Sequence, residues 1–199
     1  MTPTVDRRRR ATRQTLVRAA TGLFRRRGLA ATSVADVCAS GGVTKGVFSH
    51  HFPGGRSELA AEVIRQNGAD VAGQLRAAAA SHESPAELVT AIFSAYADLM
   101  DAKGPDFGCP VAAGVVQGTI IDPDVGAATR HAFESWRRVI ATALRDDDLA
   151  EAVLAGLEGA ILLARANGNS DPLRRVGRQL AGFTADVEPT GRRRRPRRA

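Results

Sequence analysis

The chain has 199 residues, of which 44% are apolar, 25% are charged and 5% are aromatic, a composition that suits one globular protein with a substantial core. It has no apolar run of the roughly 18 residues that a membrane span needs and no hydrophobic N-terminal segment like that of a signal peptide, so we expect a cytoplasmic protein without membrane contact. The net charge of +7 is unevenly distributed: residues 1–60 carry 11 basic and three acidic side chains, whereas residues 61–190 carry 11 and 18. This polarity predicts a basic module that meets a polyanion, joined to an acidic body with another role.

The N-terminal segment combines a basic run with a helical pattern. Apolar residues recur at helical spacing from Leu16 to Phe24, and Gly28 is a plausible stop, so we predict a first helix over about 10–27. Residues 1–9, which include "RRRR" at 7–10, are expected to form a flexible basic arm. Two interpretations of this arm remain open: it tracks a nucleic-acid backbone, or it is a disordered solubilising tail.

Two shorter helices follow around the turn "SGG" at 40–42. Ser33 with Asp36 three residues later makes a capping-box pattern, and Thr44 caps a helix over about 44–50. We expect Val47 and Phe48 on the inward side of this last helix. Three short helices with a glycine-containing turn predict a helix-turn-helix unit over residues 10–55.

The remaining residues, 56–188, are predicted to form a helical body. A long helix is expected over 56–80, and "SPAE" at 84–87 begins a helix that runs to about 102. Asp-Pro pairs at 122–123 and 171–172 mark two more starts. Together with a helix over 149–166, preceded by acidic residues at 146–148, this gives an all-α protein of about nine helices without a convincing strand.

The segment 149–166 is apolar almost all round, so its helix must be buried on several sides. Either it packs against a second copy of the chain, with small residues allowing close approach, or it is the central helix of a single copy. The small residues are Ala155, Gly156, Gly159 and Ala160. After this body, "GRRRRPRRA" closes the chain, and we expect a disordered Arg-rich tail over 189–199, because six like charges beside a proline cannot pack.

The stretch "GGVTKGVFSHHF" at 41–52 holds two histidines, but its pattern does not fit a metal or catalytic site. Adjacent His50 and His51 point about 100° apart on a helix and cannot share one ion. The chain has no HExxH, CxxC, GxSxG or phosphate-loop motif, so we expect neither a metal, nor a cofactor, nor an enzyme. Cys38 and Cys109 could pair, although two reduced thiols better suit a cytoplasmic protein.

A nucleic-acid interface explains the same stretch better. A helix beginning at Thr44 offers amide groups and a positive dipole end to phosphate, and Lys45 adds a full charge. Gly46 lets the backbone approach a groove closely. Ser49, His50 and His51 are expected to place hydrogen-bonding groups on the outer face of a helix that enters a major groove.

Residues 12–64 resemble the DNA-binding domain of the tetracycline-repressor (TetR) family of bacterial transcription regulators. The resemblance rests on Phe24, Gly28, the start at 32–34, Ala39, the pairs at 42–43 and 45–46, and His51-Phe52. "HHFPGGRSEL", "FGCPVAAGVV" and "LEGAILLARA" are similar to the branch of lincomycin- and flavonoid-responsive repressors. One departure is Ser49, because the family commonly has tyrosine there.

The resemblance implies a homodimer that binds double-stranded DNA at a palindromic operator and is released by a small apolar or aromatic ligand. It implies phosphate contacts from Thr32, Ser33, Thr44 and Lys45, and places Gly46, Val47 and Ser49 nearest the bases. Aromatic and soft residues of the body are candidates for lining the ligand pocket, although each taken alone is more often a core residue: Phe93, Tyr96, Phe107, Cys109, Trp136 and Asn167. The alternative function is that of an architectural DNA-binding protein without operator preference.

Overall fold

The computed structural model describes residues 3–117 and 122–185, and within these ranges it contains nine helices and no strand. The all-α prediction is therefore confirmed. The helices are α1 (Pro3–Arg27), α2 (Val34–Gly41), α3 (Lys45–His51), α4 (Gly55–Ser81), α5 (Pro85–Lys103), α6 (Pro110–Gln117), α7 (Pro123–Leu144), α8 (Asp147–Asn167) and α9 (Asp171–Ala185). The Arg-rich tail expected over 189–199 lies outside the described residues.

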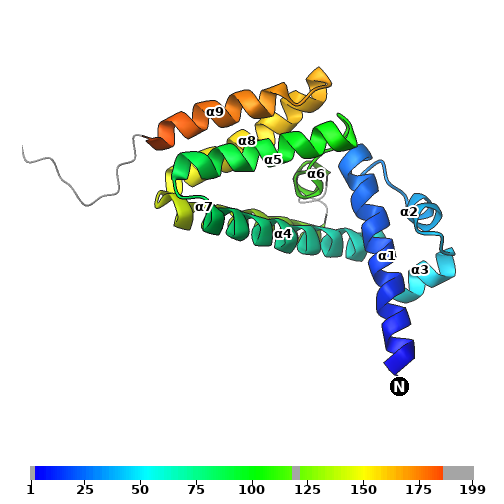
Figure 1. Ribbon diagram of the computed structural model, residues 1–199. Helices are drawn as coiled ribbons and strands as arrows, with labels where there is room; N and C mark the ends of the chain where they lie inside the picture. Colours follow the sequence, from blue (N-terminus) through cyan, green and yellow to red (C-terminus); the bar gives the residue numbers. More distant parts are fainter. Residues whose placement is uncertain (1–2, 118–121, 186–199) are drawn as a thin grey trace, which may run out of the picture.

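Helices α1–α3 form a unit at one end of the molecule, and α4 leads from it into the body (Figure 1). The small core of this unit is contributed by Leu16, Phe24, Val37, Phe48 and Phe52, each at most 2% exposed. This core continues into that of the body through Leu59 and Val63 on α4. The helix-turn-helix unit is thus supported by the helix that follows it.

The first helix is longer than predicted. It begins at Pro3, so residues 3–9 form the first turns of α1 rather than a flexible arm. Proline is well tolerated in the first turn of a helix, and arginine is a good helix former, which explains why the basic run continues the helix. The helix ends as predicted at Gly28, whose φ of 80° is accessible to glycine without strain.

Helix starts follow the capping signals of the sequence closely. Ser33 and Ser84 each form a complete capping box, and Thr44 accepts a hydrogen bond from the N–H of Val47 at 3.3 Å. Asp122 and Asp146 also cap their helices. The start predicted at the pair 171–172 is also found, because α9 begins at Asp171 and the carbonyl of Ser170 accepts its first N–H bonds.

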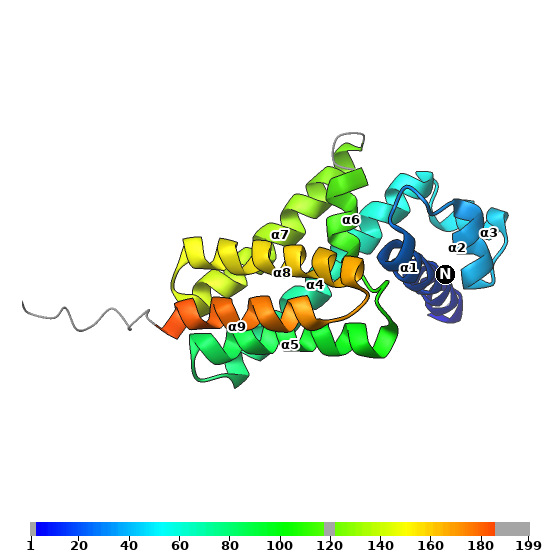
Figure 2. The ribbon, with the colours of Figure 1, turned by 90° about the horizontal axis from the view of Figure 1, so that it is seen from above.

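The body consists of α4–α9, with α5 and α9 side by side and α7 packed against both α4 and α8 (Figures 1 and 2). Gly68 permits the close crossing of α4 and α7, because an added Cβ would lie 2.7 Å from the Cβ of Ala132. At the same crossing, the indole N–H of Trp136 donates to the carbonyl of Gly68 at 2.8 Å. The short helix α6 was not located from the sequence, since its eight residues are too few to show a helical period.

The small residues of α8 lie in two different environments, some packed within the chain and some exposed. Gly156 and Ala160 pack within the chain, because a Cβ at Gly156 would lie 2.6 Å from Leu180 of α9 and Ala160 is 1% exposed. The expectation that they meet a second copy is therefore wrong for these two residues. Ala155 is exposed and Gly159 has open space beside it, and with Leu162 they form an exposed stripe along α8.

Candidate nucleic-acid interface and regulatory cavity

The exposed face of α3 carries Lys45, Gly46, Val47, Ser49 and His50. Val47 is 38% exposed, so the expectation that it faces inward is wrong, and its side chain lies on the exposed side of the helix. Phe48 is 2% exposed and anchors the opposite face. The two buried residues of this seven-residue helix are Phe48 and His51, so the polar residues Ser49 and His50 between them face outward.

His51 does not belong to this exposed face, contrary to the sequence prediction. It follows Phe48 by three residues, so both side chains lie on the inward side of α3, and His51 is only 9% exposed. Burial lowers the pKa of His51, and the nearby positive groups of His50, Arg9 and Arg13 lower it further. The imidazole is therefore neutral near pH 7 and a poor partner for phosphate.

The start of α2 also differs from expectation. Thr32 is 1% exposed and its hydroxyl donates to the carbonyl of Gly28 at 2.8 Å, so its side chain has a structural role. Ser33 is exposed, but its hydroxyl donates to the Asp36 carboxylate at 2.6 Å and accepts the N–H of Asp36. The hydrogen bonds that the carboxylate accepts from the hydroxyl and the backbone N–H of Ser33 lower the pKa of Asp36, and the negative charge of Asp36 disfavours a phosphate at the Ser33 hydroxyl.

Two arginines, Arg13 and Arg56, connect the helix-turn-helix unit (α1–α3) to the start of α4. The Arg13 guanidinium lies 4.5 Å from the centre of the Phe52 ring and pairs with Glu62 of α4 at 2.8 Å. Arg56, at the start of α4, donates to the carbonyls of Ala30 and Thr32 at 3.4 and 3.3 Å. The end of α3 is therefore tied to α1 and α4, and a displacement of either helix moves the candidate DNA-binding face.

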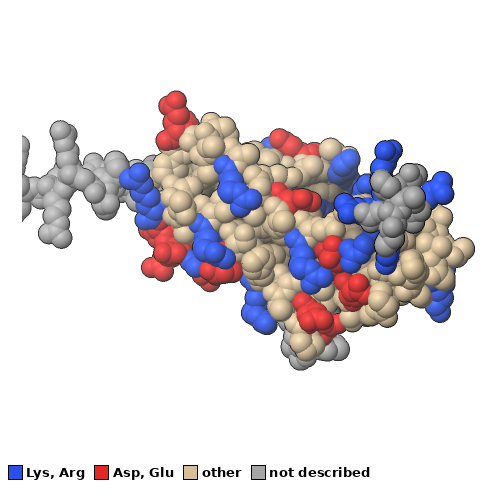
Figure 3. All heavy atoms as spheres, turned by 90° about the horizontal axis from the view of Figure 1, so that it is seen from below, with Lys and Arg blue, Asp and Glu red and all other residues tan. Residues whose placement is uncertain are grey.

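Positive side chains gather around this end of the molecule. In Figure 3, Lys and Arg dominate the end formed by α1–α3, whereas acidic and basic groups mix over the body. The arginines at 7–10 are exposed on the first turns of α1, at the same end as Lys45. This distribution is suited to the negatively charged backbone of a duplex.

A cavity of about 350 Å³ opens in the body between α1, α4, α5, α7, α8 and the segment before α6. Four of the six predicted pocket residues line it: Tyr96, Phe107, Cys109 and Trp136. The rings of Tyr96 and Phe107 lie 5.8 Å apart, and leucine and isoleucine side chains from α4, α5, α7 and α8 supply further apolar wall. Its volume lies within the range of small-molecule sites.

The other two predicted pocket residues lie elsewhere. Phe93 is 1% exposed and packs against Gly177 of α9, where an added Cβ would lie 2.5 Å from the Cβ of Phe93. Asn167 is the exposed last residue of α8. The apolar pattern of the sequence indicated that Phe93 is buried, but it could not show whether Phe93 lies in the contact between α5 and α9 or in the wall of the cavity. The amide of Asn167 lies at the end of a helix and not in the cavity.

Five polar residues of the cavity were missed by sequence reasoning: Arg25, Asn67, Asp70, Gln74 and Glu158. Glu158 interrupts the apolar segment 149–166, a signal that could have marked it. Its carboxyl is hydrogen-bonded to the thiol of Cys109, and burial raises its pKa to about 7. Burial likewise raises the pKa of the Cys109 thiol, which makes this cysteine a poor candidate for a redox sensor.

The cavity is directly connected to the end of α1. The carbonyl of Arg25 accepts the N–H of Gly108 at 3.2 Å and a guanidinium N–H of Arg165 at 3.3 Å. The same guanidinium donates to the carbonyl of Arg26 at 3.3 Å. The side chain of Arg25 lies over the Phe107 ring, 4.5 Å from its centre. The last carbonyls of α1 are therefore held by the segment that lines the cavity and by α8.

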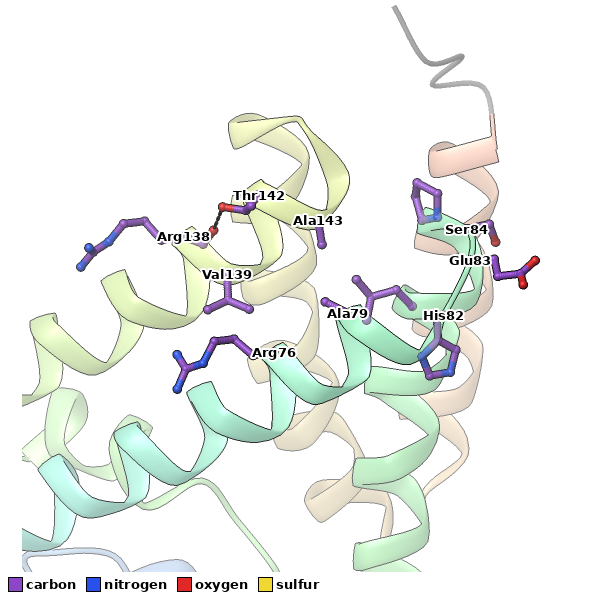
Figure 4. A pocket seen from close by; sticks show the side chains of 11 residues that line it. Arg76, Ala79, His82, Glu83, Ser84, Arg138, Val139, Thr142 and Ala143 are labelled. Carbon is purple, nitrogen blue, oxygen red and sulfur yellow. Dashed lines mark hydrogen bonds between the residues drawn. The ribbon is translucent and has the colours of Figure 1, made fainter.

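A second hollow, of about 380 Å³, lies between the end of α4, the start of α5 and α7 (Figure 4). Arg76 and Arg138 extend at its rim, and the Nδ1 atom of His82 lies 2.7 Å from the carbonyl of Ala78. This hollow is more open, and none of the unpartnered buried polar atoms found among the described side chains lines it. The cavity beside Glu158 is therefore the stronger ligand site.

A helix-turn-helix unit with a basic outer face, joined to an all-helical body with an apolar cavity, defines a DNA-binding regulator of transcription. Comparisons with known proteins agree. Residues 16–63 match the model of the bacterial regulatory proteins of the tetR family, and residues 85–179 match the C-terminal domain of LmrA/YxaF-like transcriptional regulators. The chain belongs to the TetR family of transcription regulators and is not an enzyme.

Individual relatives support the same assignment. The chain is 35% identical over 181 residues to an HTH-type transcriptional regulator of Mycobacterium tuberculosis, covering 84% of this chain and 91% of the relative. It is 26% identical over 169 residues to the HTH-type transcriptional regulator LmrA of Bacillus subtilis, covering 81% and 90%. A crystal structure of a TetR-family regulator from Agrobacterium tumefaciens shares the fold with a TM-score of 0.80 at 19% identity, covering 88% of this chain and 98% of that one. Within the described residues, no helix is long and apolar enough to cross a membrane.

Proposed function

We propose that this regulator is a homodimeric repressor that binds a palindromic operator and is released by a small apolar or aromatic ligand. The observation that carries this proposal is the attachment of the cavity to α1 through Arg25, Phe107 and Arg165. A ligand can shift DNA affinity only if it binds one arrangement of the two units better than another. The residues that line the cavity also hold the end of α1, so a ligand in the cavity can bind one arrangement of the two units better than another.

On the DNA side, Lys45, Gly46, Val47, Ser49 and His50 are proposed to face the duplex, with Thr44 at the helix start. Support comes from their exposure on one face of α3 and from the positive end of the molecule around them. His51 and Thr32 are left out because they are buried, and Ser33 because its hydroxyl is bonded to Asp36. Ser49 in place of the tyrosine common in the family leaves base contacts to smaller groups.

Dimerisation is proposed to use the exposed apolar residues of α8 and α9. Leu162 and Leu163 are 65% and 55% exposed, and Phe183 is 65% exposed. The two helices pack against each other within the chain, so these side chains lie on adjacent helices. A two-fold pairing of these helices would bury them and could set two α3 helices about one DNA turn, 34–36 Å, apart.

The test is selection of DNA sequences with the purified protein, followed by operator binding with and without a panel of apolar and aromatic compounds. A palindromic consensus, bound at least about 1,000-fold more tightly than random DNA and released by one class of compound, is the expected result. Equal affinity for selected and random DNA would instead favour an architectural DNA-binding protein. If a specific operator is selected but no compound releases the protein from it, the protein is still a sequence-specific regulator, and the proposed release by a ligand is wrong.

A further inference from the structure

Glu158 places a half-buried acid in the wall of the cavity, and it also borders a more open hollow that Arg130 and Arg137 line. Its carboxyl accepts a hydrogen bond from the thiol of Cys109, which is neutral. Among the ion pairs found between described side chains, none includes Glu158. A buried acid without a counter-ion is unfavourable when ionised, which is why the pKa of Glu158 is raised to about 7.

Two other polar atoms of the cavity have no hydrogen-bond partner among the residues that the structure describes. They are the Oδ1 atom of Asn67 and the hydroxyl oxygen of Tyr96, both buried. Buried polar atoms are nearly always satisfied in native proteins, so an unpartnered pair in one cavity points to a missing partner. An amide oxygen can only accept, and a phenol oxygen can both accept and donate. The missing partner must therefore offer hydrogen-bond donors.

The cations near the cavity are already engaged. The Arg25 guanidinium lies over the Phe107 ring, and Arg165 is bound to the carbonyls of Arg25 and Arg26. The other titratable groups of the cavity wall are Asp70 and Tyr96, together with Cys109 beside Glu158. The cavity thus presents two carboxyls and one committed guanidinium, with aromatic walls from Tyr96, Phe107 and Trp136.

We infer that the cavity selects a protonated amine on a flat apolar body, with Glu158 as its counter-ion and Asn67 and Tyr96 as acceptors of its N–H groups. The inference rests on the proposed function, which supplies the ligand site but not the charge of the ligand. An ammonium group offers three donors, which matches the three oxygen-bearing side chains. When the ligand ammonium group pairs with the Glu158 carboxylate and all hydrogen bonds of the pair are made, neither charge is buried alone. A neutral ligand leaves the ionised Glu158 without a counter-ion.

The test compares two probes of nearly equal shape, anthracenylmethylamine and anthracenylmethanol. Trp136 is the only tryptophan of the chain and lines the cavity, so quenching of its fluorescence reports binding without DNA. We expect the amine to bind at least about 10-fold more tightly than the alcohol at pH 8, where Glu158 is ionised. The Glu158→Gln variant should bind both probes equally, within about 3-fold.

Two variants separate charge selection from general damage to the protein. Glu151→Gln removes an acid that is exposed on the same helix, and it should retain the preference for the amine. Tyr96→Phe removes one acceptor and should weaken amine binding more than alcohol binding, by about 3- to 10-fold. Should Glu158→Gln fail to fold, as judged by circular dichroism, the Tyr96→Phe comparison still decides.

Three results would overturn the inference: equal affinity for the two probes, preference for the alcohol, or an amine preference that survives in Glu158→Gln. If both probes bind equally and both release operator DNA, the proposed ligand-responsive function is supported and only the inferred preference for a positively charged ligand is wrong. If neither probe changes the fluorescence of Trp136, the assignment of this cavity to amines is wrong, and the compound panel on operator release judges the broader function separately.

Discussion

Lys45 is the only fully charged side chain of α3, and it stands exposed on the first turn of that helix. Its neighbours on the exposed face are Gly46, Val47, Ser49 and His50, which bear no fixed charge. Electrostatic attraction by α3 therefore depends on one residue, while recognition of bases depends on small groups. At the other functional end, Glu158 is likewise the only acid within the cavity-facing part of α8. Within α3 and within the cavity-facing part of α8, a single residue thus carries the charge.

Replacing Lys45 by alanine should weaken binding to operator and random DNA alike, because a phosphate contact is insensitive to sequence. The slope of log K against log salt should become shallower by about 0.9, the value of one neutralised phosphate. The measurement is fluorescence anisotropy at several salt concentrations. Lys103→Ala removes the other lysine of the chain, which is exposed at the end of α5, and serves as the control. An unchanged slope in Lys45→Ala would exclude this contact.

Glu158 should make folding stability fall as pH rises. Its pKa is about 7 in the folded state against an ordinary 4.5, so the folded state holds the proton more tightly over this interval. The contribution is complete below pH 4.5 and is lost as pH rises through about 7, at most about 3 kcal/mol in all. In urea unfolding at fixed protein concentration, Glu158→Gln should gain stability relative to the wild type between pH 4.5 and 8. A constant difference would contradict the burial of the carboxyl.

At the scale of elements, helix starts were largely predictable and tertiary contacts were not. The helix starts at Ser33, Thr44 and Ser84 could be predicted because an N-cap is a local hydrogen bond between residues that are close in sequence. The inward turn of His51 and the α5–α9 burial of Phe93 depend on which helix lies opposite, which local pattern does not specify. For the same reason the sequence suggested four of the cavity residues but missed Asn67 and Glu158, whose polar groups face an apolar space.

The contact between α8 and α1 offers a test of how the two units communicate. Arg165→Ala removes the hydrogen bonds to the carbonyls of Arg25 and Arg26 but leaves every cavity-lining side chain in place. A ligand that releases the wild type should still bind this variant within about 3-fold. The loss of operator affinity on saturation, expected at about 5- to 150-fold in the wild type, should fall to less than half of its wild-type value.

The control is Arg175→Ala, which removes an exposed arginine of α9 outside the described hydrogen bonds to α1. Operator affinity measured with and without ligand gives the coupling for each protein, and calorimetry gives ligand affinity separately. Full coupling in Arg165→Ala would mean that the signal reaches α1 by another route, such as α4, which carries Arg56 and Glu62 against the helix-turn-helix unit.

At the scale of the whole molecule, the chain has a basic end and a body whose mixed charges sum to a negative value, a division already visible in the sequence. The structure adds that the most exposed large apolar residues of the body lie on α8 and α9, where Leu162, Leu163 and Phe183 are each more than half exposed; Leu99 and Val115 elsewhere are 42% and 45% exposed. Large apolar side chains exposed together on packed helices commonly mark a protein interface. The two ends therefore suit different partners, DNA at one and a second copy at the other.

The proposed dimer predicts that charge placed on α8 and α9 abolishes operator binding without touching the DNA-binding unit. The Leu162→Glu and Phe183→Glu double variant would bring four carboxylates into a two-fold interface, so the chain should become monomeric at micromolar concentration. Operator affinity should drop by at least about 100-fold, because one half-site loses the contribution of the other. Analytical ultracentrifugation measures the first effect and anisotropy the second. Ala102→Glu, at an exposed position of α5, should change neither. A double variant that stays dimeric would move the interface off α8 and α9, and it would then have to be sought on the faces of α4–α7.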